Sequence, residues 1–254
     1  MTIFKNRATR ALILTMGALV CLALAVSGIY YKNVNASVDP RIVEARKLYE
    51  NYNLYAQKSA FDSIFRLMDE IEAIYSSVDH YQDSYEIGVL YNNRAATILT
   101  IALYSEEARE NPLVQDSLMT LAMDAAEKSI EIYRRWLEKY PGKNKDEIER
   151  MISNNFLAGL EGYDTDQKEK FLKNRVKEIV ETQTETERRL SVSYNNQGII
   201  YRHKLQYEEA AGSYKMAIDL WDRNLTAENN LNVLLGRPIR KRNFIQKMFP
   251  PEKN

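Results

Sequence analysis

Apolar residues recur at three- and four-residue steps from Ile42 almost to the end of the chain, and the whole sequence contains only 9 glycines and 6 prolines. This spacing places apolar side chains along one face of an α-helix. An all-β protein needs turn residues much more often than this chain supplies them. The spacing therefore predicts an all-α fold, with one helical domain over residues 39–236.

Residues 11–31 read ALILTMGALVCLALAVSGIYY and contain no charged side chain. A helix of about twenty apolar residues, rising ~1.5 Å per residue, is long enough to cross a hydrocarbon core of ~30 Å. The run therefore predicts a transmembrane helix. The alternatives are a cleaved signal peptide with residues 34–36 as its cleavage site, and a lipoprotein signal in which Cys21 is modified. Lipidation is disfavoured because no small residue directly precedes Cys21.

The flanking charges predict the orientation of this helix. Lys5, Arg7 and Arg10 lie before it with no acidic residue among them, and basic residues favour the cytoplasmic side of a membrane. We therefore expect a short basic tail at 1–10, a linker at 32–38 and a soluble domain on the far side. The corresponding localisation is a single-pass protein of a bacterial inner membrane with a periplasmic domain.

The charge balance and the reactive side chains exclude several classes of function. Lys plus Arg and Asp plus Glu both number 35, so the chain lacks the basic field expected of a nucleic-acid partner. Cys21 is the single cysteine, and the two histidines, His80 and His203, lie far apart in the sequence. No metal-binding or nucleotide-binding motif is present. We expect no cofactor, no metal and no catalytic residue; an enzyme without a recognisable motif is the alternative.

Breaks in the apolar pattern divide the domain into helices. Glu110-Asn111-Pro112 separates two long runs, because proline is favoured at the first position of a helix and asparagine at its N-cap. Residues 181–189 carry no large apolar side chain and predict either a solvated helix or a joint. Thr184 and Glu187 have the spacing of a capping box that would open the next helix. The expected helices span about 39–56, 61–78, 83–104, 113–140, 145–160 and 166–180.

A repeat signature lies in Ser191 to Asp222, which reads SVSYNNQGIIYRHKLQYEEAAGSYKMAIDLWD. Its aromatic and small residues alternate at fixed positions in two consecutive helices, so that the small residues allow the helices to approach closely. The segment resembles a tetratricopeptide repeat (TPR). The residues that carry the resemblance are Tyr194, Gly198 and Tyr201 on the first helix, and Ala210, Tyr214 and Ala217 on the second.

A pair of asparagines in this segment recurs later in the chain. Asn195-Asn196 recurs 34 residues later as Asn229-Asn230, and 34 residues is the period of the TPR family. Residues 226–236 are then expected to form a capping helix. A diverged copy is expected earlier in the chain, with Ala95 matching Gly198 and Tyr133 matching Trp221. The resemblance implies a superhelical array of helical hairpins. The predicted fold class is therefore all-α, with the transmembrane helix at 11–31 followed by this TPR-like array.

Paired asparagines are the most unusual polar feature, because asparagine is a mediocre helix former. In TPR proteins the first helices line a groove, where an amide can both donate to and accept from the backbone of a peptide. The alternatives are that these amides bond between neighbouring repeats or face water. The resemblance implies as partner-binding candidates Asn92, Asn93, Asn195, Asn196, Arg202, Asn229 and Asn230.

The sequence thus predicts a non-catalytic, membrane-tethered scaffold or adaptor that binds protein or peptide partners through a TPR-like groove. A sensor or regulatory subunit of a membrane complex is the alternative. Residues 237–254 form a basic amphipathic tail, which would either contact anionic lipid or a partner, or remain solvated. The sequence predicts no particular oligomeric state.

Overall fold

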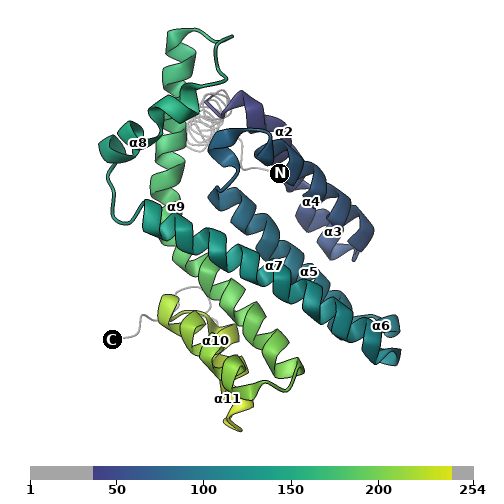
Figure 1. The fold of residues 1–254 in the computed structure, drawn as a ribbon. Coiled ribbons are helices and arrows are strands. Elements are labelled where there is room, and N and C mark those ends of the chain that lie inside the picture. Colours follow the sequence, from purple (N-terminus) through teal and green to yellow (C-terminus); the bar gives the residue numbers. More distant parts are fainter. Residues whose placement is uncertain (1–36, 242–254) are drawn as a thin grey trace, which may run out of the picture.

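The computed structural model describes residues 37–241, and every regular element in this range is a helix (Figure 1). Short 3-10 turns at Pro40–Ile42 and Asp79–Tyr81 supplement the α-helices. The α-helices are α2 (Val43–Glu50), α3 (Tyr52–Gln57), α4 (Phe61–Ser76), α5 (Tyr85–Tyr104), α6 (Glu106–Glu110), α7 (Pro112–Lys139), α8 (Lys145–Leu157), α9 (Thr165–His203), α10 (Tyr207–Leu220) and α11 (Leu225–Leu234).

The first hairpin forms as predicted: α2 and α3 pack against α4. Asp39 caps the opening turn by accepting a hydrogen bond from the main-chain N–H of Arg41. Ala45 on α2 and Ile64 and Met68 on α4 are buried between the helices. The apolar stripe read from the sequence is therefore the interface of this hairpin.

The predicted break before Pro112 is confirmed. The side chain of Asn111 accepts a hydrogen bond from the N–H of Leu113, and Pro112 occupies the first turn of α7. The short helix α6 occupies the turn between α5 and α7, so the chain reverses direction and α7 packs along α5 (Figure 1). Small residues on both helices, including Ala95 and Ala122, are fully buried where the two helices meet.

Helix α9 is a single helix of 39 residues, which confirms the solvated-helix alternative for residues 181–189 and excludes the joint. Its capping box is formed by Asp164 and Gln167 rather than by Thr184 and Glu187. The polar stretch is a solvated part of this helix, where Glu185 bonds both Arg188 and Arg189 one turn further on. The N-terminal half of α9 packs on α8, and its C-terminal half packs on α10 (Figure 1).

The two hairpins α5–α7 and α9–α10 share one packing feature. A Cβ atom on Gly88 of α5 would lie 2.6 Å from Cε1 of Tyr133, and one on Gly198 of α9 would lie 2.5 Å from Cε1 of Tyr214. In each hairpin, glycine lets the second helix press a tyrosine ring onto the first. Gly88 is therefore equivalent to Gly198, seven residues from the predicted match at Ala95.

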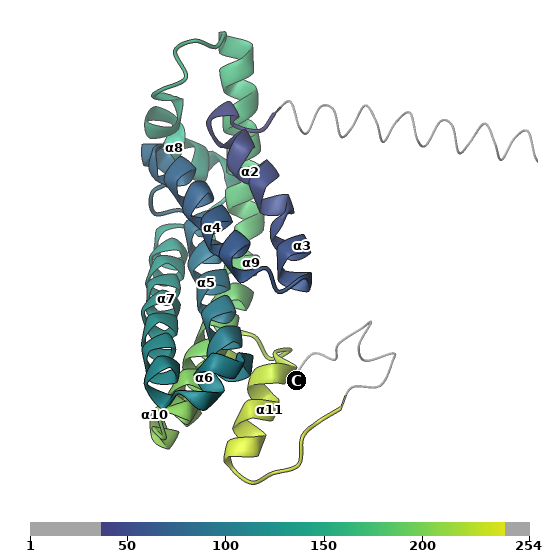
Figure 2. The same ribbon diagram turned by 90° about the vertical axis from the view of Figure 1, so that its right-hand side faces the viewer.

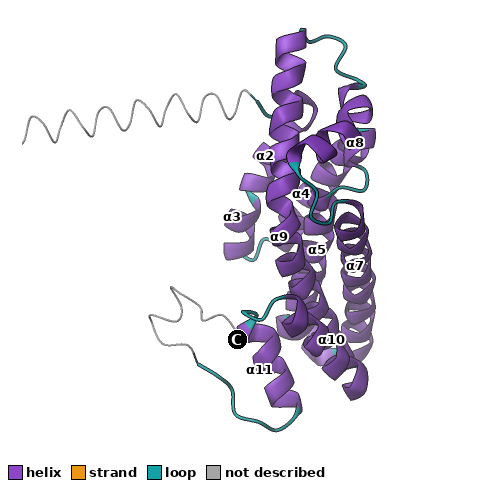
Figure 3. Ribbon diagram, turned by 90° about the vertical axis from the view of Figure 1, so that its left-hand side faces the viewer, coloured by secondary structure: helices purple, strands orange, loops and turns teal. Residues whose placement is uncertain are grey.

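Among residues 37–241, none of the helices combines the length and the hydropathy that a membrane crossing requires. This finding corrects the predicted fold class, which included a transmembrane helix. The run at 11–31, on which that part of the prediction rested, lies outside the described residues. Within the described range the fold is an all-α arrangement in which α3 and α11 extend to the same side of α9 (Figures 2 and 3).

Candidate functional site

Three helices meet at a buried seam of small polar side chains. Ser193 of α9 donates to Oδ1 of Asn92 on α5 at 3.0 Å, and its hydroxyl lies 2.9 Å from that of Ser129 on α7. Ser129 also donates to the carbonyl oxygen of Gly88 at 3.0 Å. Asn196 donates from Nδ2 to the same Asn92 oxygen at 3.3 Å. These side chains are buried and bond one another, so they fix how α5, α7 and α9 cross.

The other predicted asparagines also bond to neighbouring elements. Asn230 of α11 donates to Oδ1 of Asn195 on α9 at 2.8 Å, and Asn93 of α5 donates to the hydroxyl of Tyr49 on α2 at 2.8 Å. Asn229 bonds both main-chain polar atoms of Arg240. Each of these amides therefore forms a hydrogen bond with a residue of another segment of the chain.

The structure does not gather the seven predicted residues into one surface. Asn92, Asn195 and Asn196 are buried, whereas Arg202 near the end of α9 is half-buried. Asn229 of α11 is half-buried and bonds the main chain of Arg240, which follows this helix. Their role in binding a partner stays a prediction, and a different feature of the fold offers a better-formed cavity.

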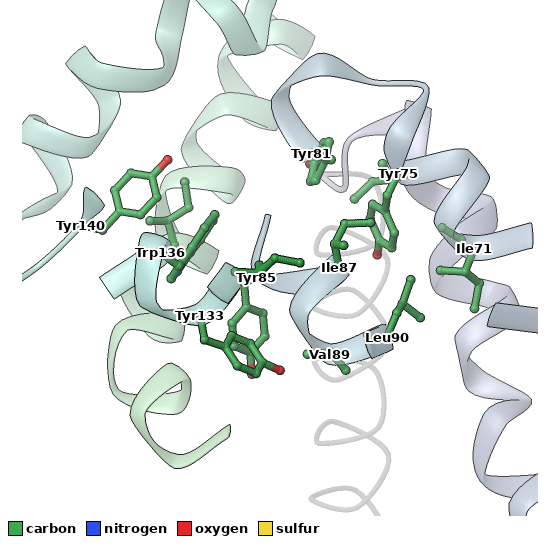
Figure 4. Close-up of a cluster of buried hydrophobic side chains, with 14 of the residues drawn as sticks. Ile71, Tyr75, Tyr81, Tyr85, Ile87, Val89, Leu90, Tyr133, Trp136 and Tyr140 are labelled. Atoms are coloured by element: carbon green, nitrogen blue, oxygen red, sulfur yellow. The ribbon is translucent and has the colours of Figure 1, made fainter. Parts of the chain in front are cut away.

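That cavity is a hollow of about 190 Å³ between α2, α4, α5 and α9. Four of the residues that line this hollow, Tyr75, Tyr85, Val89 and Leu90, are labelled in Figure 4. Tyr49, whose hydroxyl receives the bond from Asn93, lines the hollow from α2. We call this cavity the tyrosine hollow; its lining residues are Tyr49, Tyr75, Tyr85, Glu86, Val89, Leu90 and Arg189.

Glu86 is neutralised by a buried arginine. Arg175 of α9, with a side chain 2% exposed, places Nη1 2.5 Å from Oε1 of Glu86. Its Nε donates to Nε2 of His80 at 3.0 Å, and its guanidinium lies 4.3 Å from the ring centre of Tyr81. The guanidinium therefore contacts a carboxylate, an imidazole nitrogen and an aromatic ring, and a buried cation requires such partners.

The pKa values of these groups follow from this geometry. Burial alone would raise the pKa of Glu86, but the charge and hydrogen bonds of Arg175 lower it to about 2. Burial and the charge of Arg175 lower the pKa of His80 to about 3, so the ring is neutral and its Nε2 accepts a hydrogen bond. Burial raises the pKa of Tyr85 to about 12. Glu86, His80 and Tyr85 therefore each keep one protonation state near pH 7.

Arg189 supplies the positive charge of the tyrosine hollow. Its Nε donates to Oε1 of Glu185 at 2.9 Å, but the same carboxylate also bonds Arg188. One carboxylate thus serves two cations, and Glu86 is already paired with Arg175. The ion pairs around the tyrosine hollow contain one more arginine than carboxylates, since Arg46, Arg175, Arg188 and Arg189 face Glu86, Glu178 and Glu185. Apolar and aromatic walls beside this positive charge suit an apolar side chain next to an acidic group.

Sequence reasoning missed the tyrosine hollow and the Arg175 cluster. Arg175 looked like any cation of a charged helix, and no spacing rule connects it with Glu86, which lies 89 residues earlier. The Ile87-Gly88-Val89-Leu90 run was a usable signal, since a glycine within an apolar helical run indicates close packing. Within residues 37–241 no group of three or more His, Cys, Asp or Glu side chains is placed to hold a metal ion.

No family model, curated protein or solved structure matches the chain significantly.

Proposed function

We propose that the chain is a non-catalytic, TPR-like scaffold or adaptor that binds a segment of a partner protein in the tyrosine hollow. The observation that carries the proposal is the pairing of an apolar, tyrosine-walled cavity with the half-buried cation Arg189. Tyrosine and arginine are enriched where proteins bind one another.

The size of the tyrosine hollow favours a protein segment as its ligand. Pockets for small molecules usually measure about 300–1,000 Å³, whereas this one measures about 190 Å³. A single large side chain anchored in a pocket, with its neighbours lying outside, is the usual form of a hot spot between proteins.

The charges around the tyrosine hollow specify the segment further. Because Glu86 is held by Arg175 and Glu185 is shared by two arginines, an additional carboxylate meets net positive charge at Arg189. We therefore expect a partner segment with a large apolar or aromatic residue next to Asp or Glu.

Selection from a display library tests this proposal. Random peptides are panned against the full chain, and the enriched sequences are compared with those from two charge variants of α9. Arg189→Glu reverses the cation of the hollow. Lys177→Glu is the matched control, since Lys177 lies on the same helix, is solvent-exposed and does not line the cavity.

Enrichment of peptides that combine an apolar residue with an acidic neighbour supports the proposal, provided that Arg189→Glu abolishes it and Lys177→Glu does not. Far-UV circular dichroism and the melting temperature check that both variants fold like the parent. Absence of enrichment, or the same enriched peptides with Arg189→Glu, would overturn the proposal.

A further inference from the structure

The chain turns back along its last helix after α11. Gly236 adopts a positive φ of 66°, and the N–H of Arg237 donates to the carbonyl oxygen of Asn232 at 2.7 Å. This left-handed glycine reverses the chain direction at the helix end. Residues 237–241 then run beside α11 toward its N-terminal turn, as Figure 2 shows.

Asn229 binds the main chain of this returning segment. Its Nδ2 donates to the carbonyl oxygen of Arg240 at 3.0 Å, and its Oδ1 accepts from the N–H of Arg240 at 2.7 Å. One amide side chain thus satisfies both main-chain groups of one residue, as a neighbouring β-strand would. Such a contact recognises extended backbone regardless of the side chains that it carries.

One ion pair adds chemical selectivity. Nη1 of Arg240 lies 2.6 Å from Oε1 of Glu228, whose side chain is 18% exposed. The side chain of Ile239 is 54% exposed, so it adds little burial to the contact. The segment is therefore held by its backbone and by one cation, rather than by apolar packing.

We propose that Glu228 and Asn229 form a binding site for extended segments that carry a basic residue, and that residues 237–241 occupy this site as an internal ligand. A basic segment of a partner reaches the site by displacing the chain's own tail. A solvent-exposed ion pair and single hydrogen bonds each stabilise a contact only weakly. The tail is thus held weakly enough to be displaced.

Amide hydrogen exchange of Arg240, measured by NMR on the full chain, tests the internal contact. We expect Asn229→Leu to accelerate this exchange at least roughly two- to ten-fold, because it removes the acceptor of the Arg240 N–H and the loss of one hydrogen bond has an effect of this size. Arg240→Glu should also accelerate exchange at residue 240, because it places two carboxylates together. Asn232→Leu is the matched control, since Asn232 contacts the segment through its main-chain carbonyl and keeps it after the substitution.

An acetylated and amidated peptide with the sequence of residues 236–241 then tests the site in trans. It should shift the side-chain amide resonances of Asn229 and accelerate exchange at Arg240, whereas the same peptide with Glu in place of Arg240 should do neither. The proposal is overturned if Arg240 exchanges without protection in the parent, if Asn229→Leu leaves the rate unchanged, or if the peptide does not compete. Protection that falls on dilution would assign the occupant to a second copy and also overturn it.

This site is separate from the tyrosine hollow, because neither Glu228 nor Asn229 lines that cavity. Its test therefore stands or fails independently of the display selection with Arg189→Glu.

Discussion

Gly198 lies so close to Tyr214 that a Cβ atom on the glycine would sit 2.5 Å from Cε1 of the tyrosine ring. Gly88 and Tyr133 repeat this relationship in the other hairpin, at 2.6 Å. Both tyrosines are fully buried, so their rings cannot move outward without opening the helix interface.

Replacement of either glycine by alanine should therefore destabilise the fold. We expect Gly198→Ala and Gly88→Ala each to lower the free energy of unfolding by about 1–3 kcal/mol, the usual cost of overpacking a filled core. Urea denaturation followed by circular dichroism measures the change.

Gly212→Ala is the matched control for these variants. Gly212 lies within α10, and no atom lies within 4 Å of the Cβ that alanine would add. We expect this variant to be more stable by about 0.5–1 kcal/mol, because alanine favours the helix. Equal effects at positions 198 and 212 would refute the close-approach interpretation.

Removal of Arg175 should cost more than removal of an exposed cation on the same helix. Arg175→Met leaves the carboxylate of Glu86 without its partner in a largely buried position, a change that usually costs about 3–5 kcal/mol. Lys173→Met removes only the exposed pair with Glu169 and should leave the urea midpoint unchanged. The double variant Arg175→Met/Glu86→Leu should recover part of the loss, and no recovery would contradict the buried-pair account.

The same cluster makes stability depend on pH. The folded pKa of Glu86 is lowered to about 2, so its contribution is present above the unfolded value of 4.5 and is lost as pH falls through 2. The folded pKa of His80 is lowered from 6.5 to about 3, so the unfolded chain binds the proton first and stability declines between pH 6.5 and 3.

We therefore expect the free energy of unfolding to decrease from about pH 6.5 downward. His80→Gln keeps a hydrogen-bond acceptor for Arg175 but does not titrate. It should flatten the decline between pH 6.5 and 4.5, and below pH 4.5 it should leave the loss that Glu86 causes. Urea titrations at successive pH values measure both slopes, and an unchanged slope above pH 4.5 would exclude His80 as its source.

The polar seam gives a further test of how the helices are held. Asn92→Leu removes the acceptor of both Ser193 and Asn196 and leaves buried donors unsatisfied, which usually costs about 1–3 kcal/mol. Thr100→Leu is the control on the same helix, since Thr100 is exposed and bonds only within α5. Urea denaturation measures the free energy of unfolding of both variants. Similar small decreases in the two would show that the polar seam contributes little to stability.

The helices that sequence periodicity predicts best are those with clear end signals. Pro112 and Asn111 mark the start of α7 in both the sequence and the structure, because a proline and a capping side chain act locally. The sequence left open whether α9 is continuous, because the Thr184 and Glu187 spacing suggested a cap. The absence of glycine and proline between Gly162 and Gly198 was the better signal.

The candidate site was much less predictable. The pairing of Arg175 with Glu86, and the approach of Arg189 to Tyr49 and Val89, depend on how α9 crosses α2 and α5. The repeated asparagine pairs were predicted to bind a partner, yet most of their amides form hydrogen bonds between helices. The low helix propensity of asparagine indicated that these amides have a specific role. Their hydrogen-bond partners, however, depend on how the helices cross.

Photo-crosslinking tests the proposed tyrosine hollow most directly. p-Benzoylphenylalanine replaces Tyr49, which lines the cavity, or Tyr104, which is 76% exposed at the end of α5 and does not line it. The full chain is irradiated with the peptides that display selection enriches, and the adducts are counted by mass spectrometry. We predict adducts from position 49 that Arg189→Glu removes, with few from position 104. Equal labelling at both positions, or labelling at 49 that survives Arg189→Glu, would contradict binding in the tyrosine hollow.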